Sequence, residues 1–146
     1  MLTKPDVFKD LIDILTEQIE TTEPKAEAII GLESRGFLLG PTLALNLKLP
    51  FIPVRKPGKL AGIVKKEEYS LEYGKDSLEI QTESITKGMK CVVIDDLIAT
   101  GGSLIATINL VTSCGGQVIK CLVVMELVGL KGRSNVSSPI YSMIQY

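Results

Sequence analysis

Apolar side chains recur at helical spacing in three parts of the chain, residues 7–19, 36–47 and 104–114. In the first part they return every three or four positions, a pattern that predicts an amphipathic helix with one face in the core. Thr3 is the expected N-cap of that helix, and Pro24 is expected to stop it. Gly115 and Gly116 follow the third part and are typical of a helix C-terminus.

Short apolar runs separate these segments, at residues 28–32, 51–54, 91–94 and 118–125. Such runs are typical of strands that are buried on both faces of a sheet. Residues 70–73 and 77–80 alternate around Gly74 and predict a β-hairpin. Residues 141–146 are expected to form a last strand or an interface segment. Because strands alternate with helices, we expect an α/β fold with an open, mostly parallel twisted sheet flanked by helices.

Residues 56–67 show little hydrophobic periodicity and carry four scattered lysines, Lys56, Lys59, Lys65 and Lys66. Pro57, Gly58 and Gly62 interrupt the same stretch, so we expect a mobile basic loop. The alternative is that these lysines only form a solvent-exposed surface, since most runs of charged residues are exposed to water.

The composition is close to that of soluble globular proteins. The chain has 146 residues, of which 45% are hydrophobic and 23% charged, so we expect a single domain over residues 1–146. Its net charge of -1 offers no bulk attraction to nucleic acid or to an anionic membrane surface. No apolar run is long enough to span a bilayer. A polyanionic ligand must therefore be bound by a local site.

Histidine is absent from the sequence, which excludes imidazole bases and most zinc sites. Cys91, Cys114 and Cys121 have no CxxC spacing, so we expect reduced thiols in the core. The N-terminus carries no signal-peptide pattern, and the expected location is the cytoplasm.

Residues 92–103 combine a buried strand, two acids, a small-residue loop and the start of a helix. Ligands bind at the carboxyl ends of strands in open α/β sheets, so Asp95 and Asp96 are expected to face a crevice. Gly101 and Gly102 let the backbone approach a ligand, and the helix N-terminus presents free N–H groups to a phosphate. The acids suit hydroxyls, a metal or a developing cation. The segment therefore predicts a sugar phosphate as ligand.

This segment, with the hydroxyls of Thr100 and Ser103, resembles the 5-phosphoribosyl 1-pyrophosphate (PRPP) binding motif of type I phosphoribosyltransferases. Further stretches resemble the adenine branch of that family, in the same order: residues 31–38, 55–60, 69–74, and 126–127 with 130–133. The resemblance covers nearly the whole chain. It implies a type I phosphoribosyltransferase fold with a flexible β-hairpin lid. It also implies transfer of the 5-phosphoribosyl group from PRPP to adenine, giving AMP and pyrophosphate in purine salvage.

The resemblance implies a set of PRPP-binding residues. They are Asp95, Asp96, Ala99, Thr100, Gly101, Gly102, Ser103, Arg35, Arg55, Lys56 and Lys59. The two acids would contact the ribose hydroxyls, residues 99–103 would hold the 5-phosphate, and Arg35 would contact pyrophosphate. Arg55 and the two lysines would lie near pyrophosphate, partly across the interface of a homodimer. An alternative for Arg35 is a structural ion pair with an acid such as Glu33.

Glu72 is the catalytic residue that the resemblance implies, an acid/base that faces the purine with Tyr73 beside it. A carboxylate in reach can accept or relay the proton that the attacking purine loses. The alternative is a solvent-facing hairpin residue, as strand acids usually are. No metal ligand is assigned, because Mg²⁺ is expected to arrive with PRPP.

The resemblance lacks one part of the family pattern. Members usually begin with an additional stretch, rich in Phe, Pro and Gly, that covers the active site and lines the base pocket. Because Met1 aligns with a later helix, we expect an N-terminally short domain with an intact PRPP site and reduced base recognition. The alternatives are a PRPP-binding but inactive subunit or regulator, and a transferase for another base.

Overall fold

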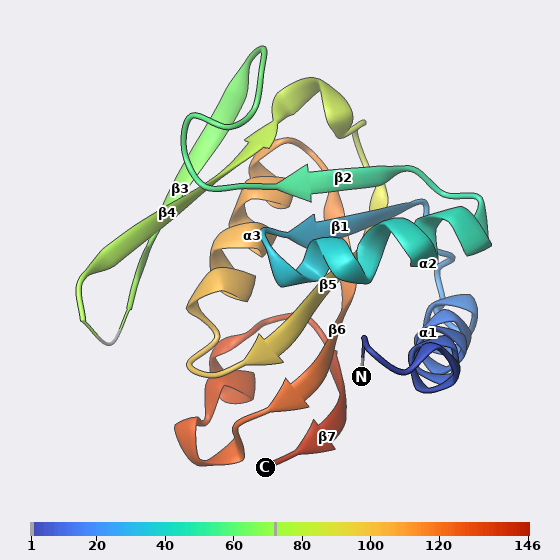
Figure 1. Ribbon diagram of the computed structural model, residues 1–146. Coiled ribbons are helices and arrows are strands. Elements are labelled where there is room, and N and C mark those ends of the chain that lie inside the picture. The colour runs from blue at the N-terminus through green and yellow to red at the C-terminus, as the bar shows by residue number, and fades with distance from the viewer. Residues whose placement is uncertain (1, 72) are drawn as a thin grey trace.

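A five-stranded sheet forms the centre of the molecule in the order β2-β1-β5-β6-β7 (Figure 1). Its strands are β1 (Ala28–Leu32), β2 (Phe51–Val54), β5 (Lys90–Ile98), β6 (Gln117–Glu126) and β7 (Ile140–Gln145). Every pairing between these strands is parallel, which confirms the predicted sheet. The computed structural model describes residues 2–71 and 73–146, so Glu72, the expected acid/base, lies outside the described residues.

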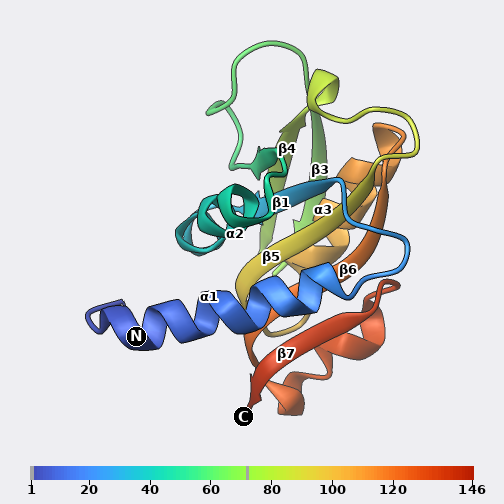
Figure 2. The same cartoon turned by 90° about the vertical axis from the view of Figure 1, so that its right-hand side faces the viewer.

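Helices cover both faces of the sheet, as Figures 1 and 2 show. α1 (Pro5–Glu20) and α2 (Gly40–Leu47) lie on one face, and α3 (Gly102–Ser113) lies on the other. Alternate strand residues divide the core accordingly. Ile29, Val92, Ile94 and Leu122 pack with α1 and α2. Ile30, Val93, Cys121 and Val123 pack with α3 and the hairpin. The two-sided burial explains why the central parts of β1, β5 and β6 are mostly apolar.

A separate antiparallel hairpin projects beside α3, formed by β3 (Val64–Ser70) and β4 (Lys75–Gln81) (Figure 1). The hairpin is confirmed, but its arms differ from the prediction. Residues 64–67, expected in a basic loop, form the first half of β3, where Val64 pairs with Gln81. The sequence did not predict this arm because residues 65–68 are all Lys or Glu, so no apolar alternation marks it.

Three boundaries also differ from the predictions. α1 has Lys4 rather than Thr3 at its N-cap, with no side-chain cap. The helix expected over residues 36–47 is divided into a 3-10 turn (Arg35–Leu38) and α2, with Pro41 in the first turn of α2. Proline has no N–H to extend a preceding helix, so a new helix starts here. β5 continues past Ile94 to Ile98, so both acids lie within the strand.

In residues 2–71 and 73–146, no helix has the length and apolar content that crossing a membrane requires. Cys91 and Cys121 are buried and Cys114 is half-buried, all as free thiols. Burial raises the pKa of both buried thiols to about 12, so they behave as apolar core side chains.

Candidate active site

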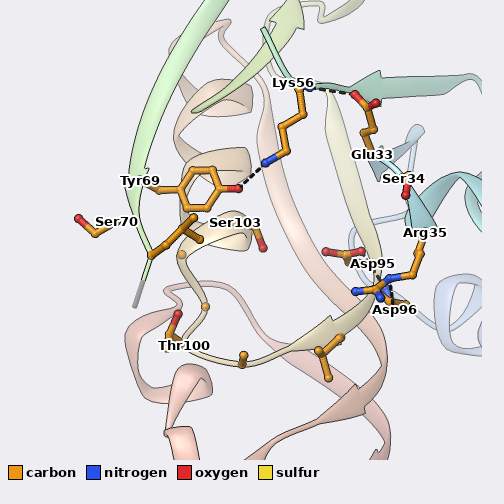
Figure 3. A pocket seen from close by; sticks show the side chains of 15 residues that line it. Glu33, Ser34, Arg35, Lys56, Tyr69, Ser70, Asp95, Asp96, Thr100 and Ser103 are labelled. Carbon is orange, nitrogen blue, oxygen red and sulfur yellow. Dashed lines mark hydrogen bonds and ion pairs between the residues drawn. The ribbon is translucent and has the colours of Figure 1, made fainter. Parts of the chain in front are cut away.

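A cavity of about 520 Å³ opens at the carboxyl edge of the sheet (Figure 3). Four chain segments line it: Glu33, Ser34 and Arg35 after β1, Lys56 after β2, Tyr69, Ser70 and Leu71 at the end of β3, and Asp95, Asp96, Leu97, Ala99, Thr100, Gly101, Gly102 and Ser103 from β5 to α3. Parallel strands bring these segments together because their carboxyl ends share one edge. The position agrees with the crevice predicted from sequence.

Residues 99–103 form the wall of the cavity at the N-terminus of α3, and we call them the phosphate-binding loop. Gly101 is the N-cap of α3 with φ +89, in the left-handed region that favours glycine. The first N–H groups of a helix have no partner within the helix and carry its positive dipole end. Gly102 and Ser103, the first residues of α3, line the cavity. The loop therefore suits a phosphate group.

Asp95 and Asp96 lie beside this loop, and Asp96 forms an ion pair with Arg35 (Figure 3). The Arg35 Nε atom lies 2.7 Å from Asp96 Oδ2, and the Asp96 amide donates to Asp95 Oδ1 at 2.9 Å. Burial raises the pKa of Asp95 well above its usual range, and the charge of Asp96 adds to the effect. Arg35 thus forms an ion pair with an acid, as the alternative expected, but its partner is Asp96, which lines the cavity, and not Glu33.

Glu33 holds the other basic residues that the sequence singled out. Its carboxylate accepts bonds from Arg55 Nε and Nη2, both at 3.2 Å, from the Lys56 amide at 2.9 Å, and from Lys59 Nζ. Burial alone would raise the pKa of Glu33, but these donors outweigh it and bring the pKa to about 2. Lys56 lines the cavity, whereas Arg55 and Lys59 are not among the described lining residues and are paired with Glu33.

The ammonium group of Lys56 reaches the hairpin (Figure 3). It contacts the Asp76 carboxylate, lies 3.2 Å from the Tyr69 hydroxyl, and sits 5.7 Å from the centre of the Tyr69 ring. Sequence reasoning assigned no role to Tyr69 or Asp76. The sequence marked Tyr69 only as the first residue of the 69–74 stretch, and Asp76 is its partner across the hairpin, one pair before the turn.

The side chains that could act as metal ligands determine which cation the site can bind. The described residues contain no group of three or more His, Cys, Asp or Glu side chains able to hold a metal. Asp95 and Asp96 supply two carboxylates at the cavity. Mg²⁺ commonly binds one or two carboxylates and takes its other ligands from water and substrate phosphates. The residues therefore fit a magnesium ion that is shared with a phosphorylated ligand.

Comparisons with known proteins relate the whole chain to one group of enzymes. A phosphoribosyl transferase domain model matches residues 1–145. An adenine phosphoribosyltransferase of Drosophila pseudoobscura pseudoobscura is 49% identical over 145 residues, which cover 99% of this chain and 80% of that protein. An adenine phosphoribosyltransferase of Picosynechococcus is 45% identical, with 100% and 86% covered.

Comparison of the fold with solved structures relates the chain to the same enzymes. The crystal structure of the Saccharomyces cerevisiae adenine phosphoribosyltransferase, in complex with an imino-altritol bisphosphate and adenine, superimposes with a TM-score of 0.94. It is 45% identical to this chain, and the match covers 97% of this chain and 82% of the yeast chain. The sheet and its flanking helices are common to both proteins.

Proposed function

Because this chain belongs to the adenine phosphoribosyltransferase family, we propose that its cavity binds PRPP through residues 95–103 and Arg35. The activity is that of the family, transfer of a phosphoribosyl group to adenine. One observation carries the assignment of the site: two acids, a phosphate-binding loop and an arginine line the same cavity. The 5-phosphate accepts hydrogen bonds from the loop, while Asp95 and Asp96 accept from the ribose hydroxyls.

The same geometry supplies the groups that the reaction needs. When pyrophosphate leaves the anomeric carbon, positive charge develops on the ribose, and the neighbouring carboxylates favour that charge. Negative charge gathers on the leaving group, where Arg35 offers a guanidinium suited to bidentate phosphate contact. Lys56 provides a second cation at the cavity wall. Magnesium, when bound with PRPP, neutralises pyrophosphate charge, and Asp95 and Asp96 are the residues that would hold it.

The proposed contact with the purine base rests on the sequence. Glu72 would accept or relay the proton lost by the purine, without any histidine. Glu72 follows Leu71, which lines the cavity at the end of β3. The position of its sequence neighbour Leu71 in the cavity lining supports an acid/base role over that of a solvent-facing residue.

We also propose a homodimer, with Arg55, Lys56 and Lys59 near its interface. Two apolar side chains of the segment from the 3-10 turn (Arg35–Leu38) to α2 are exposed, Leu38 to 47% and Leu45 to 78%. Burial of such residues against a second copy would be favourable. Sedimentation equilibrium should give twice the 15.8 kDa chain mass, and Leu45→Glu should shift it toward the monomer. Three free thiols support a cytoplasmic location, which cell fractionation tests.

An assay of the purified chain with adenine, PRPP and MgCl₂ tests the function. AMP and pyrophosphate should form in equal amounts, and hypoxanthine, guanine and orotate should compete poorly with adenine. Lack of AMP above background would contradict transferase activity. In that case calorimetry with PRPP would reveal a binding subunit without turnover, a reading that the comparisons do not favour.

A further inference from the structure

Residues 128–135, which follow β6, pack against the outer side of the phosphate-binding loop. The segment consists of two 3-10 turns, Val128–Leu130 and Gly132–Asn135, and we call it the 128–135 segment. None of its residues is among the described residues that line the cavity. An effect of this segment on ligand binding must therefore act through the loop.

The contact between loop and segment is made by backbone. A Cβ atom added at Gly132 would overlap the carbonyl oxygen of Ala99 and lie 2.9 Å from the Gly101 amide nitrogen. A Cβ added at Gly101 would lie 2.9 Å from the carbonyl oxygen of Gly132. Asn135 Nδ2 donates to the Thr100 carbonyl at 3.3 Å. The position of the loop backbone is thus set by the position of Gly132.

A bidentate ion pair fixes the segment to the sheet. Glu126, the last residue of β6, is 5% exposed and accepts from Arg133 Nε at 2.9 Å and from Nη2 at 2.5 Å. Arg133 Nη1 donates to the Ile140 carbonyl, and the Ser142 hydroxyl donates to Glu126 at 2.7 Å. The two β7 residues and the end of β6 form a rigid base, from which Arg133 holds the adjacent Gly132.

We propose that Gly132 and Arg133 are positioning residues for PRPP binding, which hold the backbone of the phosphate-binding loop in the geometry that receives the 5-phosphate. This inference rests on the proposed function. Hydrogen bonds weaken steeply when the donor angle departs from linearity, so a small shift of the loop misaligns several N–H donors together. Adenine does not contact the 5-phosphate, and its binding should depend much less on this geometry.

Gly132→Ala and Gly129→Ala form a matched pair of variants. Both glycines lie in the 128–135 segment without a positive φ, but a Cβ at Gly129 meets open space. Gly132→Ala should raise the KM for PRPP and the Kd for ribose 5-phosphate by about tenfold, the cost of one charge-assisted hydrogen bond. The KM for adenine should stay within about twofold, and Gly129→Ala should match the wild type.

Arg133→Lys tests the anchor separately and serves if Gly132→Ala fails to fold. Lysine keeps the charge but loses the two-pronged contact with Glu126, so the KM for PRPP should rise while that for adenine holds. Equal KM increases for both substrates in Arg133→Lys, or equal behaviour of the two glycine variants, would overturn the inference. If the wild type makes no AMP, the proposed function fails, whereas ribose 5-phosphate calorimetry still decides the positioning role.

Discussion

Two acids at the same edge of the sheet have opposite electrostatic environments. Asp95 is half-buried beside Asp96, and this partial burial raises its pKa to about 7. The pKa of Glu126 falls to about 2, chiefly because Arg133 donates two bonds to it. The fold thus favours the neutral form of Asp95 and the charged form of Glu126. A carboxyl group whose environment disfavours its charged form, such as Asp95, is typical of a functional site. A carboxylate whose charge is neutralised by an ion pair, such as Glu126, is typical of a structural site.

Replacing Asp95 with asparagine should therefore reduce activity more than stability. A raised pKa in the folded state contributes stability below the unfolded value of 3.8, and this is lost as pH rises through about 7. At pH 8, Asp95→Asn should keep or raise the melting temperature, while kcat falls by roughly 100-fold because the developing ribose charge loses a carboxylate. Melting curves at pH 5 and pH 8, with steady-state rates, check this. A large loss of stability at pH 8 would mean that Asp95 is a structural residue.

Glu126→Gln should give the opposite pH dependence. A lowered pKa contributes stability above the unfolded value of 4.5, and this is lost as pH falls toward about 2. At pH 7 the variant should lose about 2 kcal/mol of unfolding free energy, a value reduced from the full shift because Arg133 is partly exposed. The difference from wild type should shrink below pH 4 in urea titrations. Asp13→Asn, in the exposed pair with Lys9, is the control and should cost little.

Among the elements, the β3–β4 hairpin contributes to the cavity through the end of β3. Tyr69 and Ser70 at the end of β3 approach Gly102, where an added Cβ would lie 3.1 Å from the Ser70 carbonyl oxygen and from Tyr69 Cδ2. Asp76 on β4 contacts Lys56. The Lys56 ammonium group is proposed to contact pyrophosphate, but it already forms an ion pair with the Asp76 carboxylate. Asp76 and pyrophosphate therefore compete for the same cation.

Asp76→Asn should therefore tighten the binding of pyrophosphate. Loss of the competing charge frees Lys56, and the inhibition constant of pyrophosphate should fall by roughly threefold, within the range of a partly exposed ion pair. Product-inhibition kinetics measure it. Glu68→Gln removes one negative charge from the exposed side of the same hairpin and serves as control. Weaker pyrophosphate binding in Asp76→Asn alone would show that the pair positions Lys56 instead of competing for it.

The sequence predicted those elements whose hydrophobic pattern results from burial in the core. The apolar runs at residues 28–32, 51–54, 91–94 and 118–125 were correctly predicted as strands. Residues 64–67 of β3, which has charged side chains at its exposed positions, were assigned to a loop. The phosphate-binding loop and the two acids before it were predictable because they are contiguous in residues 95–103. Glu33 bonding to Arg55 and Lys59 joins positions 22 and 26 apart, and no local pattern reports such pairs. Arg35 was placed at the cavity, but its partner Asp96 was not foreseen.

At the scale of the whole molecule, the helices that cover one face of the sheet and the cavity proposed to bind ligand are separate parts of the fold. The packed layer of α1 and α2 covers one face of the sheet, and the cavity lies at the carboxyl edge. None of the α1 residues lines the cavity among those described. Changes in this layer should alter the folding equilibrium without altering the chemistry.

Leu15→Ala tests this separation. Leu15 is fully buried in α1, so its truncation should cost about 3 kcal/mol of unfolding free energy in urea titrations. Both KM values should remain unchanged at a temperature where the variant is folded. Ile14→Ala, on the outer side of the same helix and 38% exposed, should cost less than about 1 kcal/mol. Similar costs for the two variants would contradict the described packing of α1.

The strand order has a consequence for synthesis on the ribosome. β1 lies between β2 and β5, so it pairs with residues 51–54 on one side and with 91–94 on the other. The first pairing is possible once β2 has emerged, but the second must wait for roughly forty more residues, or roughly 2 to 8 seconds of translation. During that interval one edge of a fully apolar strand is open, and this nascent chain is where chaperone capture would have most effect.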